Sequence, residues 1–388
     1  VCSLYCTFCC AMSLWLITYN VLSPNFCSQE KYPRCSIDAV DPDKRLERIL
    51  AQVKGFTQRR QGTRARPVLC LQEVSLSWAS KLYAMFDAQG YKWISEQYSS
   101  PSSDYMGVLV AWPSEDFVLK DSLVKRVSDL LPSQPDEDDG FLSLSVSKIF
   151  SGLVTCTSTR EKDFDEYTEA RRANRIIYTT LFHRHAKEEF VIGNYHMPCL
   201  FGSAAKVRVV NMHAAAIVEE LHRIAEGKPC ILTGDFNFDP STPPYRMITT
   251  GRLSRADPTC PRYFPDGVDL PPMRSAYSER NGKEPEFTNN VFVEAGPFTE
   301  VLDYIFLSER SATAEPDWDV QEVLPLPRLS DVQRENKEAD AGVFYPTAEQ
   351  PSDHLPIGAH LSFHSKRGIF SGLGSRKNLK DDLESTTS

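Results

Sequence analysis

The sequence predicts an α/β fold. After residue 12, short apolar runs typical of buried strands alternate with longer segments whose apolar residues recur every three or four positions, as in amphipathic helices. The chain has 388 residues, of which 41% are hydrophobic and 24% charged, and this composition is ordinary for a globular protein with a large core. We therefore expect one α/β domain over residues 13–364.

The first half of this domain begins with two pairs of a strand and a helix. Strands are predicted at 14–22 and 67–74, and amphipathic helices at 43–56 and 76–89. Two further strands follow at 91–98 and 105–112. The segment from about 125 to 168 is acidic, contains "PDEDDG" and has weak periodicity, so we expect a solvated surface insertion there.

The second half repeats this alternation. Its predicted elements are strands at 175–183 and 188–196, a long helix at 204–226, and strands at 230–236, 301–308, 319–327 and 354–363. A proline-rich stretch at 257–272 and a loop at 328–350 separate the later strands. The rest, 365–388, is rich in Lys, Gly, Ser and Asp, so we expect a disordered tail.

Charge and cysteine usage exclude several classes of protein. The net charge of −9 does not provide the broad basic surface of sequence-independent duplex binders, and no apolar run is long enough to span a bilayer. The 11 cysteines are irregularly spaced, unlike a disulfide framework, which favours a reducing compartment. We expect an intracellular, cytoplasmic monomer without membrane contact.

The N-terminal segment 1–12 leaves an organelle open as the location. Four cysteines fall within its first ten residues, and it lacks the basic start of a signal peptide. We expect this segment to be unstructured or to precede the true start, with Met12 as the candidate initiator.

The stretch "CILTGDFNFDP" (230–240) ends an apolar strand with two polar residues, Asp235 and Asn237. Side chains two apart on a strand point the same way, so we expect both at the rim of the sheet on one face. A carboxylate and an amide placed there suit a metal ion and a phosphate oxygen. An ordinary Asx turn is the alternative.

Other predicted strands also end in polar side chains. These residues are Asn20, Glu73, Asn194 and His196, joined by Asp303 within an apolar strand and by Asp353 and His354 before the last strand. Each alone has an ordinary explanation as a solvated or locally paired group. Together, however, burying so many polar groups is costly unless they pair or bind metal, so they indicate an acidic site for a hard cation.

Six motifs carry a family resemblance. In order, "TYNVLS", "LQEV", "NYHMP", "GDFN", "LDYIF" and "SDHLPI" resemble the endonuclease/exonuclease/phosphatase superfamily, whose members include DNase I, over residues 13–363. "LQEV", "FTN" (287–289) and "DYIF" are most similar to its deadenylase, nocturnin, Angel and 2′-phosphodiesterase branch. The resemblance implies a four-layer α/β sandwich in which two mixed β-sheets pack face to face with helices outside.

The resemblance also implies roles for the strand-end residues. Glu73 would be the principal Mg²⁺ ligand, with Asn20 nearby and Mn²⁺ as a substitute ion; Asp353 would help to hold a second ion, and one or two ions remain open. Asp235 would orient or deprotonate the attacking water. Asn237 and His196 would hold phosphate oxygens, while His354, oriented by Asp303, would stabilise developing charge.

Candidate substrate contacts are fewer. Phe298 falls where the resembled deadenylases carry a base-stacking aromatic, although a loop Phe packed on the core is an equal alternative. Asn194 and Asn289 are further candidates for substrate contact, and Asn289 could instead cap a turn. Cys199 stands where abasic-site endonucleases have Asn, which disfavours a role in DNA repair.

The leading hypothesis is a Mg²⁺-dependent phosphodiesterase acting at RNA 3′ ends, a 3′ exoribonuclease with some preference for poly(A). The alternatives are a phosphatase of a small phosphorylated molecule, either a nucleotide cofactor or an inositol phosphate, and a catalytically silent binding module. The basic cluster at 169–175 is the main feature that suits an inositol phosphate. The presence of every required acid and histidine disfavours the silent module.

Overall fold

The computed structural model describes residues 12–58, 66–131, 164–262, 264–309, 318–332 and 343–363. The acidic insertion expected at about 125–168 is therefore described only at its two ends. Residues 1–11 and the expected tail at 365–388 lie outside the described residues, and Met12 begins the first strand. Of the helices in these ranges, none has the length and apolarity needed to cross a membrane.

One six-stranded sheet, called the β1 sheet below, has the strand order β15-β16-β1-β2-β4-β3. The strands are β1 (Met12–Asn20), β2 (Val68–Val74), β3 (Tyr91–Gln97), β4 (Gly107–Pro113), β15 (Trp318–Val323) and β16 (Ile357–Phe363). β1 and β2 run parallel and the other neighbours antiparallel, so the sheet is mixed.

The second six-stranded sheet, called the β7 sheet, has the order β11-β14-β8-β7-β6-β5. Its strands are β5 (Phe117–Arg126), β6 (Arg175–His183), β7 (Glu188–His196), β8 (Cys230–Asp235), β11 (Met273–Ser275) and β14 (Asp303–Ser308). Here β7 and β8 form the parallel pair. The two sheets thus share one design, a parallel pair flanked by antiparallel strands.

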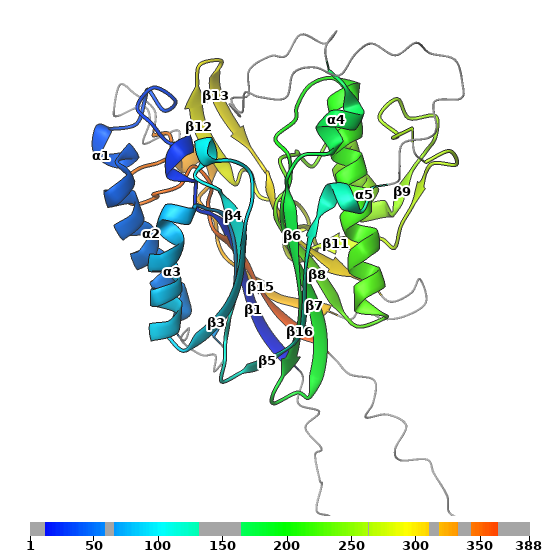
Figure 1. Cartoon of the computed structure of the whole chain (residues 1–388), viewed down its shortest axis with the longest axis horizontal. Coiled ribbons are helices and arrows are strands. Elements are labelled where there is room, and N and C mark those ends of the chain that lie inside the picture. The colour runs from blue at the N-terminus through cyan, green and yellow to red at the C-terminus, as the bar shows by residue number, and fades with distance from the viewer. Residues whose placement is uncertain are drawn as a thin grey trace, which may run out of the picture.

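Helices cover the outer face of each sheet (Figure 1). α2 (Pro42–Thr57) and α3 (Leu76–Ala88) pack on the β1 sheet, whereas α5 (Ala204–Ala225) and α6 (Pro243–Thr250) pack on the β7 sheet. The predicted four-layer sandwich of two mixed sheets with helices outside is confirmed.

The core lies in three layers because strand side chains alternate between faces. On β1, Leu14 and Leu16 join the cluster between the sheets, whereas Trp15 and Ile17 join the cluster under α2 and α3. A third cluster fills the space between the β7 sheet and α5. Burial on both faces explains why these strands appear in the sequence as nearly continuous apolar runs.

Helix α2 shows how local sequence sets an element. The Asp41 carboxylate caps its N-terminus by accepting from the backbone N–H groups of Asp43 and Lys44, and Pro42 takes the first helical position, where it has no hydrogen bond to lose. Further along, Leu46 and Ile49 face the core. The helix therefore begins one residue before the predicted 43–56.

Several smaller elements were not predicted from the sequence. β5 is an edge strand with a bulge between Leu119 and Asp121, which breaks the alternation that marks a strand, and it extends into the start of the expected insertion. The hairpin of β12 (Asn289–Val293) and β13 (Gly296–Glu300) was not expected either. The other short elements are α1 (Ile37–Val40), α4 (Glu166–Ala170), α7 (Ala276–Asn281), β9 (Arg252–Leu253) and β10 (Val268–Asp269).

Candidate active site

The strand register brings the predicted polar residues to one end of the sandwich. In the β1 sheet, Asn20 pairs with Gln72, the residue before Glu73. In the β7 sheet, Asp235 has His196 as its partner on β7 and Asp303 as its partner on β14. Asp235 is therefore the centre of the group.

Asn20 joins the two sheets through the acidic residues. Its Nδ2 donates to Oε1 of Glu73 at 3.0 Å and to Oδ2 of Asp235 at 2.9 Å. Its Oδ1 accepts from the backbone N–H of Leu22 at 2.9 Å, which settles the orientation of the amide. Asn20 therefore turns its nitrogen, not its oxygen, toward the acids, and it bridges Glu73 and Asp235 rather than offering an oxygen to a metal.

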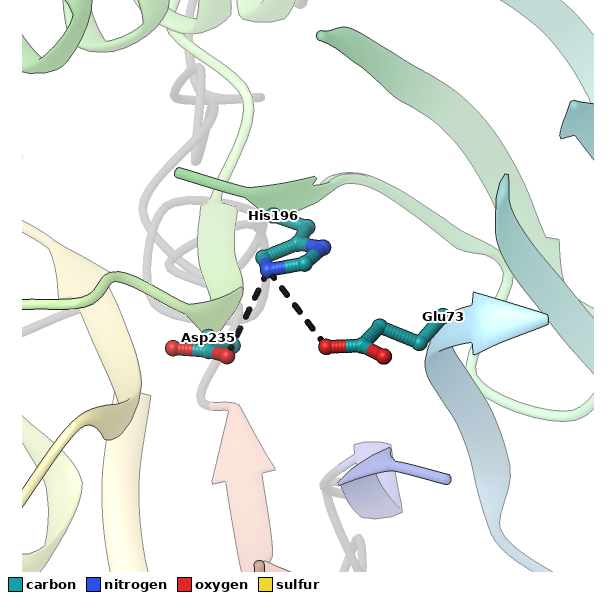
Figure 2. A group of neighbouring side chains, drawn as sticks. All are labelled: Glu73, His196 and Asp235. Carbon is teal, nitrogen blue, oxygen red and sulfur yellow. Dashed lines mark ion pairs between the residues drawn. The ribbon is translucent and has the colours of Figure 1, made fainter. Parts of the chain in front are cut away.

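Glu73, His196 and Asp235 converge from different strands (Figure 2). His196 Nε2 lies 3.6 Å from Oδ2 of Asp235 and 3.9 Å from Oε1 of Glu73, and one ligand atom from each residue lies within 4.8 Å of the others. Both carboxylates are buried, and within the described ranges neither forms an ion pair with Lys or Arg. Neighbouring buried carboxylates are costly without a cation, so the pair of Glu73 and Asp235 fits a hard divalent ion such as Mg²⁺, with His196 beside it.

The backbone at Glu73 is left-handed, with φ +57°. The side chain of the preceding residue, Gln72, already points between the sheets, where it donates to Asn194 Oδ1. In a regular strand the next side chain would point to the opposite face, toward the helices. The left-handed turn instead aims Glu73 at Asp235 and Asn20, so backbone strain here serves the site.

His354 and Asp303 form a second pair beside Asp235. His354 Nδ1 lies 2.8 Å from Asp303 Oδ2, which also accepts from the Thr288 hydroxyl at 2.7 Å. His354 Nε2 lies 3.6 Å from Asp235 Oδ2. The ring therefore presents one nitrogen to its carboxylate partner and the other to the centre of the site.

Electrostatics keep this histidine charged. Burial alone would lower the pKa of His354, but the carboxylates of Asp303, Asp235 and Asp353 raise that pKa well above its ordinary value. Burial raises the pKa of Asp303 to about 6, opposed by His354. At neutral pH the pair is an imidazolium and a carboxylate, so Nε2 of His354 is a hydrogen-bond donor to an anion.

His196 is oriented by groups around it. The Tyr98 hydroxyl lies 3.3 Å from its Nδ1, and Asn174 Nδ2 donates to its carbonyl oxygen at 2.9 Å. Neither Tyr98 nor Asn174 was singled out from the sequence. Nothing in their local sequence pattern indicated that they meet His196.

Three predicted site residues have their side chains engaged elsewhere. Asn194 lies between the sheets, where it accepts from Gln72 and donates to the carbonyl oxygens of Leu71 and Leu109, so it links the sheets and we no longer assign it to substrate. Asp353 accepts from the Tyr32 hydroxyl at 2.9 Å. It belongs neither to the group of Glu73, His196 and Asp235 nor to the second group with converging ligand atoms, Asp235, Asp303 and His354, so we do not propose it as a ligand.

The third, Asn237, holds its own loop. Its backbone N–H donates to Oδ1 of Asp235, and its Nδ2 donates to the carbonyl oxygen of Met197. Its backbone is left-handed, with φ +49°. Asn237 therefore supports Asp235 and the chain after His196.

Phe298 and Asn289 lie at the β12–β13 hairpin. Phe298 packs on a small apolar cluster and meets Phe201 edge to face, with ring centroids 5.8 Å apart. Asn289 pairs through its backbone with His354, and its buried Oδ1 lacks a hydrogen-bond partner among the described residues. Phe201, 37% exposed in the loop after His196, was missed because sequence does not reveal which loop aromatics are exposed.

A family model described as "Endonuclease/Exonuclease/phosphatase family" matches residues 17–354. The chain belongs to this family. The name groups nucleases and phosphatases, both of which hydrolyse phosphoester bonds. The predicted resemblance is thereby confirmed.

Curated relatives agree with the branch. The chain is 22% identical over 364 residues to 2′,5′-phosphodiesterase 12 of Mus musculus, covering 89% of this chain and 51% of that protein. It is also 22% identical over 399 residues to the CCR4-Not complex 3′-5′-exoribonuclease subunit Ccr4 of Phaeosphaeria nodorum, covering 88% and 58%. The chain thus spans about half the length of the curated relatives it matches.

Solved structures share the fold. ANGEL2, a 2′,3′-cyclic phosphatase, superposes with a TM-score of 0.66 at 17% identity, covering 92% of this chain and 97% of that one. The human Nocturnin catalytic domain gives a TM-score of 0.54 at 18% identity, covering 90% and 94%. At such identities the likeness concerns the fold alone.

Proposed function

We propose that this protein is a metal-dependent phosphodiesterase of RNA, a 3′ exoribonuclease with a preference for poly(A). The observation that carries the proposal is the position of Asp235 Oδ2, 3.6 Å from Nε2 of both His196 and His354. A phosphate seated beside these three groups would meet two imidazole nitrogens and a carboxylate. Such preorganised groups are what phosphoester hydrolysis needs.

In this proposal the side chains divide the work, and Asp235 has two tasks. Glu73 and Asp235 would hold Mg²⁺ or Mn²⁺, which when bound neutralises charge on the phosphate. Asp235 orients the attacking water and accepts its proton. His354, kept charged by Asp303, donates to a phosphate oxygen, and His196 donates to another.

RNA is favoured by the aromatic pair of Phe201 and Phe298. The partly exposed rings can stack on a base at the terminal nucleotide, and stacking accepts any base. The 3′ to 5′ direction follows the name of the Ccr4 subunit, a 3′-5′-exoribonuclease. The preference for poly(A) rests on the resemblance of "LQEV", "FTN" and "DYIF" to deadenylases.

The test is Mg²⁺-dependent digestion of a 5′-labelled RNA that ends in a run of A, with Glu73→Ala as the inactive control. A shortening ladder that the control lacks would support a 3′ exoribonuclease, and tails of other bases would rank the preference for A. The absence of any ladder would overturn the proposal.

A small-molecule phosphatase is the second candidate, because the family groups phosphatases with nucleases. The basic cluster at 169–175 gives this candidate little support, because two of its arginines are already paired. Arg172 pairs with Glu169, and Arg175 pairs with Glu96. Phosphate release from NADPH, inositol phosphates or a terminal 2′,3′-cyclic phosphate, without a ladder, would favour this candidate. A chain that binds RNA but releases nothing would be a silent binding module.

A further inference from the structure

We infer that Tyr105 is a second stacking surface, which takes a nucleobase on the 5′ side of the scissile phosphate. The inference rests on the proposed ribonuclease function. It concerns the loop between β3 and β4, which carries no residue discussed above except Tyr98.

This loop, residues 98–106, is tied to the catalytic residues at more than one point. At its start, Tyr98 contacts His196 through its hydroxyl. In its middle, the carbonyl oxygen of Ser103 accepts from the hydroxyl of Ser23, whose backbone N–H donates to Glu73 Oε2 at 2.9 Å. Since consecutive Cα atoms lie about 3.8 Å apart, the Cα of Tyr105 lies within roughly 8 Å of that of Ser103.

The other end of the loop also adjoins the chain that follows Glu73. The backbone N–H of Leu76 donates to the carbonyl oxygen of Asp104 at 2.9 Å, and Val74 pairs with Gly107. In Figure 1 the cyan turn Pro101–Ser103 lies beside the dark blue turn Pro24–Phe26, at the end of the sandwich that also carries β12 and β13. Tyr105 is therefore a residue of the rim of the site.

Tyr105 is both strained and exposed. Its φ is +47°, and Asp104 before it has φ +52°. A bulky residue is unfavourable in this left-handed region, which Gly and Asn tolerate far better. Tyr105 is 39% exposed, and within the described ranges its ring stacks on no other ring and under no cation. Core packing does not account for a strained tyrosine here, and such outliers concentrate at functional sites.

An exposed ring on a loop that is tied to the site suits a nucleobase. An aromatic face stacks on any base, and the Phe201–Phe298 pair is already assigned to the terminal base. In a 3′ exoribonuclease every other base lies on the 5′ side of the scissile phosphate. Tyr105 would therefore hold a base that stays with the shortened chain.

The experiment is a cycle between enzyme and substrate variants. The enzymes are wild type, Tyr105→Asn, which suits the left-handed backbone but lacks the ring, and Tyr105→Phe, which keeps the ring. The substrates are a 5′-labelled oligoadenylate and versions that lack one base near the 3′ end. For the intact substrate we expect kcat/KM to fall about 5- to 100-fold in Tyr105→Asn and to stay near wild type in Tyr105→Phe.

The inference is decided by the coupling between the Tyr105→Asn substitution and the missing base. At one abasic position wild type should fall to the level of Tyr105→Asn, and that variant should lose nothing further, because the two partners of one contact are then both absent. Losses that add at every abasic position would overturn the stacking surface. So would a loss for Tyr105→Asn accompanied by a lower melting temperature, since relieving the strain should raise that temperature or leave it unchanged.

Binding of the same oligonucleotides, followed by fluorescence anisotropy, separates this inference from the proposed activity. Hydrolysis by wild type without coupling to Tyr105 would overturn the stacking surface alone. Binding that is coupled to Tyr105 without hydrolysis would overturn the proposed activity and support the surface. Neither binding nor hydrolysis would overturn both.

Discussion

The Nε of Arg45, on α2, donates a hydrogen bond of 2.8 Å to the carbonyl oxygen of Pro351, a residue 306 positions later in the chain. The same fully buried guanidinium donates through Nη2 to the carbonyl oxygens of Val21 and Leu22. One side chain thus fastens the segment after Asn20 to the segment that leads to His354. The distance between these two segments, which carry Asn20 and His354, therefore depends on Arg45.

Arg45→Lys should destabilise the fold and lower the turnover rate. A single ammonium cannot reproduce the planar fork of donors, so buried carbonyl oxygens lose partners, at a cost of about 2–4 kcal/mol. Urea denaturation measures the stability, and RNA shortening measures the turnover. Arg48→Lys, on the partly exposed neighbour that pairs with Asp38, should cost less than about 1 kcal/mol. Equal effects of the two substitutions would contradict the fastening role.

Asp235→Asn should abolish hydrolysis while the protein stays folded. The amide has nearly the shape of the carboxylate but cannot accept a proton from water, so we expect a rate loss of about 10²- to 10⁴-fold with RNA binding retained. Asp269→Asn, at an exposed position of β10, is the matched control and should remain active. A fully active Asp235→Asn would remove this residue from the mechanism.

Glu73→Gln should remove the stabilisation that Mg²⁺ confers. Saturating Mg²⁺ at about 100 times its Kd stabilises the native state by about 2.7 kcal/mol, which melting experiments can detect without any activity assay. The variant should also melt higher than metal-free wild type, because it no longer faces Asp235 with a second negative charge. Glu219→Gln, on the exposed face of α5, should keep the full Mg²⁺ response. An unchanged response in Glu73→Gln would place the ion elsewhere.

Phe298→Ala should weaken hydrolysis of oligoadenylate more than that of a small phosphomonoester. Loss of one stacked base corresponds to about 5- to 100-fold in kcat/KM, and a substrate without a base there should be spared. Phe292→Ala, on the neighbouring strand of the same hairpin, controls for loosening of the hairpin. If kcat/KM falls equally for both substrates, Phe298 contributes to packing and not to base stacking.

The parts of the site that sequence could predict are those where a polar residue interrupts a regular pattern. Glu73, Asp235 and Asp303 stand out because each adjoins a run of apolar strand residues, and the parallel pairs bring such strand ends together. The same logic misplaced Asn194, which adjoins the same kind of run but faces the opposite sheet. Strand periodicity alone does not distinguish the rim of a sheet from the interface between two sheets.

Other parts of the fold and site depend on tertiary contacts, which leave no pattern in the local sequence. Arg45 lies in a helix among charged residues and would be expected at the surface, yet it is buried because it meets carbonyl oxygens from two distant segments. The β12–β13 hairpin turns at Glu294 and Ala295 and lacks the usual Asn-Gly or Asp-Gly signal. Hence the aromatic pair of Phe201 and Phe298 became visible only in the structure.

His213, buried on α5, should make the fold sensitive to acid. Its Nε2 lies 2.8 Å from the carbonyl oxygen of Ala170, which can only accept, so this nitrogen carries the proton and Nδ1 accepts from the Tyr195 hydroxyl at 2.7 Å. Both bonds use the neutral ring. Burial lowers the pKa of His213 to about 4, with a smaller contribution from Arg172.

The direction in which pH changes the free energy of unfolding follows from proton linkage. An unfolded histidine has a pKa near 6.5, so between about pH 6.5 and 4 the unfolded chain binds the extra proton and the folded chain does not. The stabilisation is complete above pH 6.5 and is lost as the pH falls toward 4, which amounts to about 2 kcal/mol at pH 5. His213→Gln cannot titrate, so its free energy of unfolding should fall less between pH 7 and pH 5 than that of wild type. His185→Gln, on an exposed turn, should keep the wild-type dependence. Identical slopes for His213→Gln and wild type would show that folding does not shift the pKa of His213.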